Sequence, residues 1–103
     1  MNTSSCDCHQ VATTADVKQP GDFCFSECDG MLRIIMWLPG EIPDDLGFRI
    51  IPIRRNGVAE THPSWEWDGN KDKPTLKPSI LARGMNNEEI WHGHMTAGRL
   101  VSC

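Results

Sequence analysis

The stretch IWHGHMTAGRLVSC, residues 90–103, holds both the clearest fold signal and the clearest chemical signal of the chain. Two apolar-leaning runs flank the dipeptide Ala97-Gly98, a spacing typical of a two-residue β-hairpin in which Gly adopts a positive φ. Because side chains alternate along a strand, His92 and His94 should share one face of the hairpin. The opposite face then carries Trp91 and Met95. The sequence therefore predicts a final hairpin that presents two imidazoles on the same side.

Strand signals also precede this hairpin. Residues 31–38 (MLRIIMWL) and 47–55 (GFRIIPIRR) are rich in apolar and β-branched residues, which favour strands. The dipeptide Asn56-Gly57 predicts a second hairpin, in which residues 47–55 pair with a short return strand at residues 58–61. No repeat or heptad is present. We therefore expect a mainly β fold: a small single-domain antiparallel sheet or partly open barrel, with hairpins and at most one or two short helical turns.

The chain length and composition predict one domain. With 103 residues and 39% hydrophobic residues, the chain is long enough to bury one modest core. Residues 1–20 are polar and show no sustained periodicity, so we expect a flexible N-terminal tail there. The single β-rich domain is then expected to span residues 21–103.

Charge and hydropathy narrow the classes of partner. A formal net charge of -4 and a pI near 5.4 argue against a nucleic-acid binder that works through a broad basic surface. No apolar run approaches the roughly 20 residues that a membrane-spanning helix needs, and the N-terminus lacks the pattern of a signal peptide. We expect a cytoplasmic protein without membrane partners.

Five cysteines occur in this chain, and four of them lie near its start. Without an export signal, reduced thiols or metal ligation are expected in place of a disulfide framework. Cys24 and Cys28 have the three-residue gap found in zinc sites, whereas Cys6 and Cys8 are closer together than usual. One interpretation is a zinc ion bound by these four cysteines. The alternative is a surface tail, with Cys24 packed as a small hydrophobic residue.

Three strings of residues carry a family resemblance: residues 65–70 (WEWDGN), 73–80 (KPTLKPSI) and 91–95 (WHGHM), followed by Gly98 and Cys103. Together they resemble a family of small phage and prophage proteins that has a domain-of-unknown-function label and is sometimes misnamed ammonia monooxygenase. Its relatives resemble zinc-containing serine peptidases of bacterial ubiquitin-like operons. The resemblance covers roughly residues 64–103 and implies a β-rich fold with a Ser-His pair at Ser79 and His92.

The chemistry of such a pair sets further expectations. A serine nucleophile needs a base within hydrogen-bond reach, and His92 on a strand facing Ser79 would meet that need. Asp68 or Asp72, both near turns, is expected to orient the histidine. The resulting hypothesis is a hydrolase, of peptidase type, that acts on a protein substrate. The structural alternative is that Ser79 bonds a strand end while His92 packs against Trp65 or Trp67.

Two further hypotheses come from other classes of protein. The first is a phage protein without enzymatic activity that binds and inhibits a host or defence component, which its small size and acidic charge would suit. The aromatic surface for such binding would come from Trp37, Trp65, Trp67 and Trp91. The second is a structural module stabilised by zinc, for which Cys6, Cys8, Cys24 and Cys28 are the candidate ligands.

Overall fold

A computed structural model describes residues 6–39, 48–60, 63–83 and 86–102. Within these ranges, one short 3-10 turn, Thr14–Asp16, accompanies nine strands. The strands are β1 (Cys6–Asp7), β2 (His9–Gln10), β3 (Asp22–Cys28), β4 (Met31–Met36), β5 (Arg49–Arg55), β6 (Trp65–Trp67), β7 (Leu76–Arg83), β8 (Glu89–Thr96) and β9 (Arg99–Ser102). No helix in this part of the chain is both long and apolar enough to cross a bilayer.

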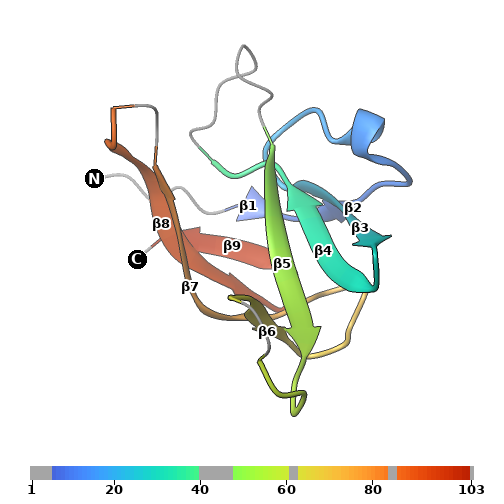
Figure 1. Ribbon diagram of the computed structural model, residues 1–103. Coiled ribbons are helices and arrows are strands. Elements are labelled where there is room, and N and C mark those ends of the chain that lie inside the picture. The colour runs from blue at the N-terminus through green and yellow to red at the C-terminus, as the bar shows by residue number, and fades with distance from the viewer. Residues whose placement is uncertain (1–5, 40–47, 61–62, 84–85, 103) are drawn as a thin grey trace.

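The strands form one sheet that curls into a nearly closed barrel (Figure 1). Their order is β1-β9-β8-β7-β6-β5-β4-β3-β2. The first strand of this order, β1, and the last, β2, are separated in the sequence only by Cys8. The Cys8 N–H donates to the Gly98 carbonyl at 2.9 Å, and the next N–H, of His9, donates to the Gly21 carbonyl at 2.9 Å. The segment 6–11 therefore joins both edges of the sheet.

The barrel interior holds the main hydrophobic core. Alternate residues of the strands point inward, as the two-residue period of a strand requires. The buried core residues are Phe23, Ile34, Met36, Leu38, Ile51, Ile53, Trp67, Leu76, Ile80, Ala82, Trp91, Met95 and Leu100. A smaller cluster, made of Val17, Cys24, Ile35 and Trp37, packs separately from them. Each long strand therefore has an inner face that is fixed by burial.

The fold prediction is confirmed: the chain is mainly β and forms a single domain with one nearly closed barrel. The final hairpin is also confirmed, because β8 pairs with β9 across Ala97 and Gly98, whose φ angles are 48° and 78°. Two successive positive φ angles are typical of a type I′ turn. The sheet is nevertheless mixed, since β2 pairs with β3 and β5 with β6 in parallel.

The predicted hairpin at Asn56-Gly57 is wrong. Gly57 has a φ of 92°, but Asn56 is not among the residues with positive φ, so the turn is not the I′ type that brings two strands back together. The Asn56 N–H instead donates to the Trp67 carbonyl at 2.8 Å, and β5 takes β6 as its parallel neighbour. No return strand forms at residues 58–60; residue 61 lies outside the described ranges.

Part of the predicted N-terminal tail has ordered neighbours. Cys6 and Asp7 pair with Leu100 and Arg99, and β2 pairs with β3. The Asp7 carboxylate also forms an ion pair with Arg99 at 2.9 Å. These contacts involve backbone groups and exposed charges. Contacts of this kind require no hydrophobic periodicity, so the sequence pattern does not indicate them. The flexibility of residues 1–20 stays a prediction, and residues 1–5 lie outside the described ranges.

Candidate functional site

Strands β7 and β8 carry the two residues of the predicted Ser-His pair. They are antiparallel, with Ile80 opposite Gly93 and Leu81 opposite His92. The inner face of this pair is buried, so the alternation places Leu81 and His92 on the outer face. Ser79, two residues before Leu81, is on the same face and diagonal to His92, a position from which side chains of neighbouring strands interact.

The two side chains are within hydrogen-bond distance of each other. Ser79 Oγ lies 3.2 Å from His92 Nε2, and both residues are half-buried. When Nε2 carries no proton, it accepts a hydrogen bond from the serine hydroxyl. This is the arrangement in which an imidazole can take the hydroxyl proton as the oxygen attacks an electrophile. His94 is on the same strand and face, but its side chain is exposed.

The main chain of Ser79 has a second contact, which the sequence did not predict. The indole N–H of Trp65 donates to the Ser79 carbonyl at 3.1 Å. Trp65 is half-buried and packs against the barrel core. The alternation of Trp65 and Trp67 predicts only that they share a face of β6. Locating this bond requires the register between β6 and β7, which the residues alone do not show.

Asp68, one of the two predicted orienting acids, lies in the turn that follows β6. Its Oδ1 accepts hydrogen bonds from the N–H groups of Asn70 and Thr75, at 3.1 Å and 3.2 Å. Asp72, the other predicted acid, is exposed in the same connection. Ser79 is the one hydrogen-bond partner of the His92 ring within the described ranges. An orienting role for Asp68 therefore stays a prediction, without a direct bond to His92.

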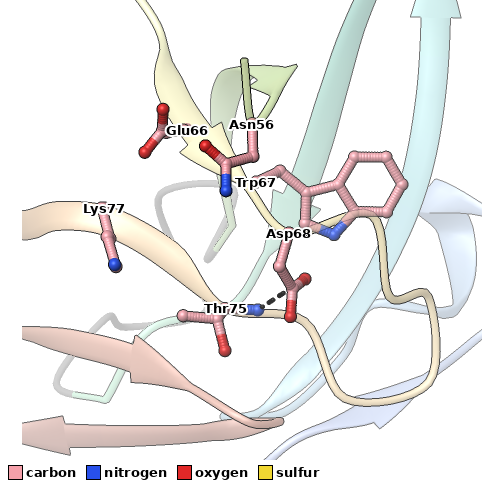
Figure 2. Close-up of a pocket in the computed structure, with 6 residues that line it drawn as sticks. All are labelled: Asn56, Glu66, Trp67, Asp68, Thr75 and Lys77. Carbon is pink, nitrogen blue, oxygen red and sulfur yellow. Dashed lines mark hydrogen bonds between the residues drawn. The ribbon is translucent and has the colours of Figure 1, made fainter.

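A cavity of about 150 Å³ opens beside this turn (Figure 2). Figure 2 shows the Thr75 N–H bonded to Asp68, with Glu66 and Lys77 on the other side of the opening. Glu66 and Lys77 are directly opposite each other in the ladder between β6 and β7. The lining residues are Asn56, Glu66, Trp67, Asp68, Thr75 and Lys77. Ser79 and His92 do not belong to this lining.

The four candidate zinc ligands lie in different places. Cys6 and Cys8 pack against the main core, Cys24 is buried in the smaller cluster, and Cys28 is exposed at the end of β3. Burial, followed by the neighbouring Cys6 and Asp7, raises the pKa of the Cys8 thiol to about 12. Within the described ranges, no three metal-ligating side chains come together. Zinc binding by these cysteines stays a prediction.

The aromatic surface expected for a binding protein is mostly absent. Trp37, Trp67 and Trp91 are buried, with exposed fractions of 6%, 1% and 4%, and only Trp65 is half-exposed. The prediction that all four tryptophans offer surface contacts is therefore wrong. Trp67 and Trp91 lie at inward positions of β6 and β8 and belong to the main core, whereas Trp37 follows β4 and packs in the smaller cluster. Large aromatic rings contribute much of the buried area of such cores. Inhibition of a host or defence component stays a prediction, but without this aromatic surface.

Comparison with known proteins gives one family. The chain matches the family described as "Bacterial ubiquitination-like system serine protease (BubE)" over residues 49–103. No curated protein and no solved structure matches it. The matched region contains β5 to β9 and both members of the Ser79-His92 pair. Because the match spans more than half of its length, this chain belongs to the family of bacterial ubiquitination-like system serine proteases, BubE.

Proposed function

We propose that this protein is a serine-type hydrolase of peptidase character, with Ser79 as nucleophile and His92 as general base. The observation that supports this most directly is the 3.2 Å separation of Ser79 Oγ and His92 Nε2. Membership of a family described as serine proteases supports the same chemistry independently of the distance. The substrate class in this proposal is a protein or peptide.

The proposed reaction begins with the Ser79 hydroxyl bonded to neutral His92. As Oγ attacks the carbonyl carbon of the substrate, its proton passes to Nε2, and a tetrahedral intermediate forms. His92 then gives that proton to the leaving amine, which leaves an acyl group on Ser79. A water molecule, deprotonated by His92, attacks the acyl group; as the acyl–Oγ bond breaks and the acid leaves, His92 returns the proton to Oγ and restores the Ser79 hydroxyl. General-base assistance of this kind contributes roughly 10²- to 10⁴-fold to the rate.

A fluorophosphonate probe tests the proposal, because it reacts covalently with activated serine hydroxyls. The wild-type protein should be labelled at Ser79, as identified by mass spectrometry of the digested protein. Ser79→Ala should abolish labelling, and His92→Ala should slow it by roughly 10²- to 10⁴-fold. Cleavage of a ubiquitin-like protein with a C-terminal extension, a substrate suggested by the family description, would be measured beside it.

Two matched variants serve as controls. Ser26→Ala removes a serine from β3, and His94→Ala removes a histidine from the same strand and face as His92. Both should be labelled at the wild-type rate, with circular dichroism confirming that all four variants fold. Labelling that persists in Ser79→Ala, or a wild-type protein that does not react, would contradict the proposed function.

A further inference from the structure

The ladder between β7 and β8 is irregular at Ser79. Leu76 is opposite Met95, and the next regular pair is Ile80 opposite Gly93. Residues 77–79 of β7 therefore face a single residue of β8. Such a bulge leaves extra residues without a regular ladder position and redirects their side chains. The backbone at Ser79 is thus not held by regular pairing with β8.

The pairing with β6 also stops short of Ser79. Its last pair toward Ser79 joins Glu66 to Lys77, and the intervening Pro78 has no N–H to donate. At this point the Trp65 indole N–H, 3.1 Å from the Ser79 carbonyl, supplies the hydrogen bond. The Trp65 ring is itself anchored by packing against the barrel core. A side chain of β6 therefore takes over where the backbone ladder ends.

Ser79 consequently has two hydrogen bonds that point to opposite neighbours. Its carbonyl is bound from β6 by Trp65, and its hydroxyl is within reach of His92 on β8. A rotation of the Ser79 backbone would break the first bond and move Oγ away from Nε2 at the same time. We infer that Trp65 is a positioning residue, which fixes the Ser79 main chain so that the hydroxyl meets His92. The effect of Trp65 on the reaction rate rests on the proposed function, whereas its effect on the contact between Ser79 and His92 does not.

The β6 strand offers a matched pair of variants for the test. Trp65→Phe keeps an aromatic ring but removes the indole donor. Trp67→Phe makes the same change two residues away, where the indole N–H donates to the Asn70 carbonyl at 3.1 Å. The second-order rate of fluorophosphonate labelling should fall about tenfold or more in Trp65→Phe, approaching the roughly hundredfold cost of a 1 Å misplacement. Trp67→Phe should stay within about twofold of wild type.

A second readout does not depend on activity. The ¹⁵N chemical shift of His92 Nε2, measured by NMR at fixed pH, reports whether the ring nitrogen is bonded to the Ser79 hydroxyl. In Trp65→Phe this shift should move toward its value in Ser79→Ala, and in Trp67→Phe it should remain at the wild-type value. A purely structural role for Trp65 would leave the shift unchanged in a folded variant.

The outcomes separate the two proposals. If wild-type protein is not labelled but the Nε2 shift responds to Trp65→Phe, the hydrolase proposal fails and the positioning role stands. If Trp65→Phe folds with the wild-type labelling rate and the wild-type shift, the positioning role is overturned. Should either Phe variant fail to fold, incorporation of benzothienylalanine at position 65 decides, because it keeps the ring size and removes only the N–H. Wild-type values in that protein would also overturn the inference.

Discussion

Gly93 sits in the middle of β8 and faces the barrel interior, between the outward-facing His92 and His94. A Cβ added there would meet Cζ2 and Cη2 of Trp91 at 2.5 Å and 2.6 Å, and would come even closer to the Val101 carbonyl. Carbon atoms pack favourably at about 3.5–4.0 Å. The Trp91 ring would therefore have to move by about 1 Å, although it is buried and its N–H is bonded to Ser102 Oγ at 3.0 Å.

We predict that Gly93→Ala destabilises the protein by about 2 kcal/mol, within the range of overpacked cores. In a domain of this size, that loss lowers Tm by roughly 8–16 °C. The sign of the change is informative, because Gly→Ala at a compatible position stabilises a protein by about 0.4–1 kcal/mol through the unfolded chain. The assay is urea unfolding followed by tryptophan fluorescence, together with a thermal melt.

Two comparisons isolate the cause. Gly30→Ala meets no atom within 4 Å, so its cost should come only from the positive φ of 78° at that turn. Gly93→Ala should then cost less stability in a Trp91→Leu background than in the wild-type protein, whereas Gly30→Ala should cost the same in both. A Gly93→Ala protein as stable as wild type, or more stable, would refute the steric reasoning. Additivity of Gly93→Ala with Trp91→Leu in the double-mutant cycle would refute the assignment to the Trp91 ring.

Three further predictions concern other parts of the barrel. Asp68→Ala should lower the free energy of unfolding by about 1–2 kcal/mol, because two turn N–H groups lose their acceptor, whereas Asp68→Asn keeps an acceptor and should change that energy little. A strong loss of fluorophosphonate labelling in a stable Asp68→Asn protein would favour the orienting role for Asp68. Burial raises the pKa of the Cys8 thiol from 9.0 to about 12, so its contribution to stability is present below pH 9 and is lost as pH rises from 9 through 12. The free energy of unfolding in urea should therefore fall less steeply with pH over that range in Cys8→Ala than in wild type, and an equal pH dependence would contradict this role of Cys8. Deleting residues 1–10 should expose the edges of β3 and β9 and cause concentration-dependent association in light scattering, whereas a monomer of wild-type stability would count against their role in closing the barrel.

The turns explain how far the sequence predicts this fold. Three of the dipeptides that end in Gly are compared: Asp29-Gly30, Asn56-Gly57 and Ala97-Gly98. The first and third have positive φ at both residues and close hairpins, although Ala is a poor residue for that conformation. Around Ala97, tertiary bonds impose the turn, since its N–H donates to Thr75 Oγ1 at 2.9 Å and the Gly98 N–H donates to the Pro74 carbonyl at 3.0 Å. Asn56-Gly57 is the dipeptide most typical of a hairpin turn, but it forms no hairpin because the Asn56 N–H bonds to the distant Trp67.

For the candidate site too, the sequence predicts local features and not the contacts that depend on register. The alternation of β8 correctly separates His92 and His94 from Trp91 and Met95, because it depends only on the two-residue period of a strand. The pairing of Ser79 with His92 came from the family resemblance and not from spacing, because the bulge in β7 shifts the register between them. The Trp65 bond depends on where two ladders end, and no local pattern in the chain encodes that point.

The segment 6–11, which joins both edges of the sheet, also constrains the order in which the protein can fold. Cys6 pairs with Leu100, so β1 has no partner until synthesis has passed residue 100. The strands β2 to β8 can pair with partners that emerge soon after them, while β1 and the free edge of β8 remain unpaired until β9 is complete. Such long-range closure slows folding and prolongs the exposure of unpaired edges. Closure of the barrel is therefore expected to be a late and slow folding step, and aggregation during synthesis is the hazard that accompanies it.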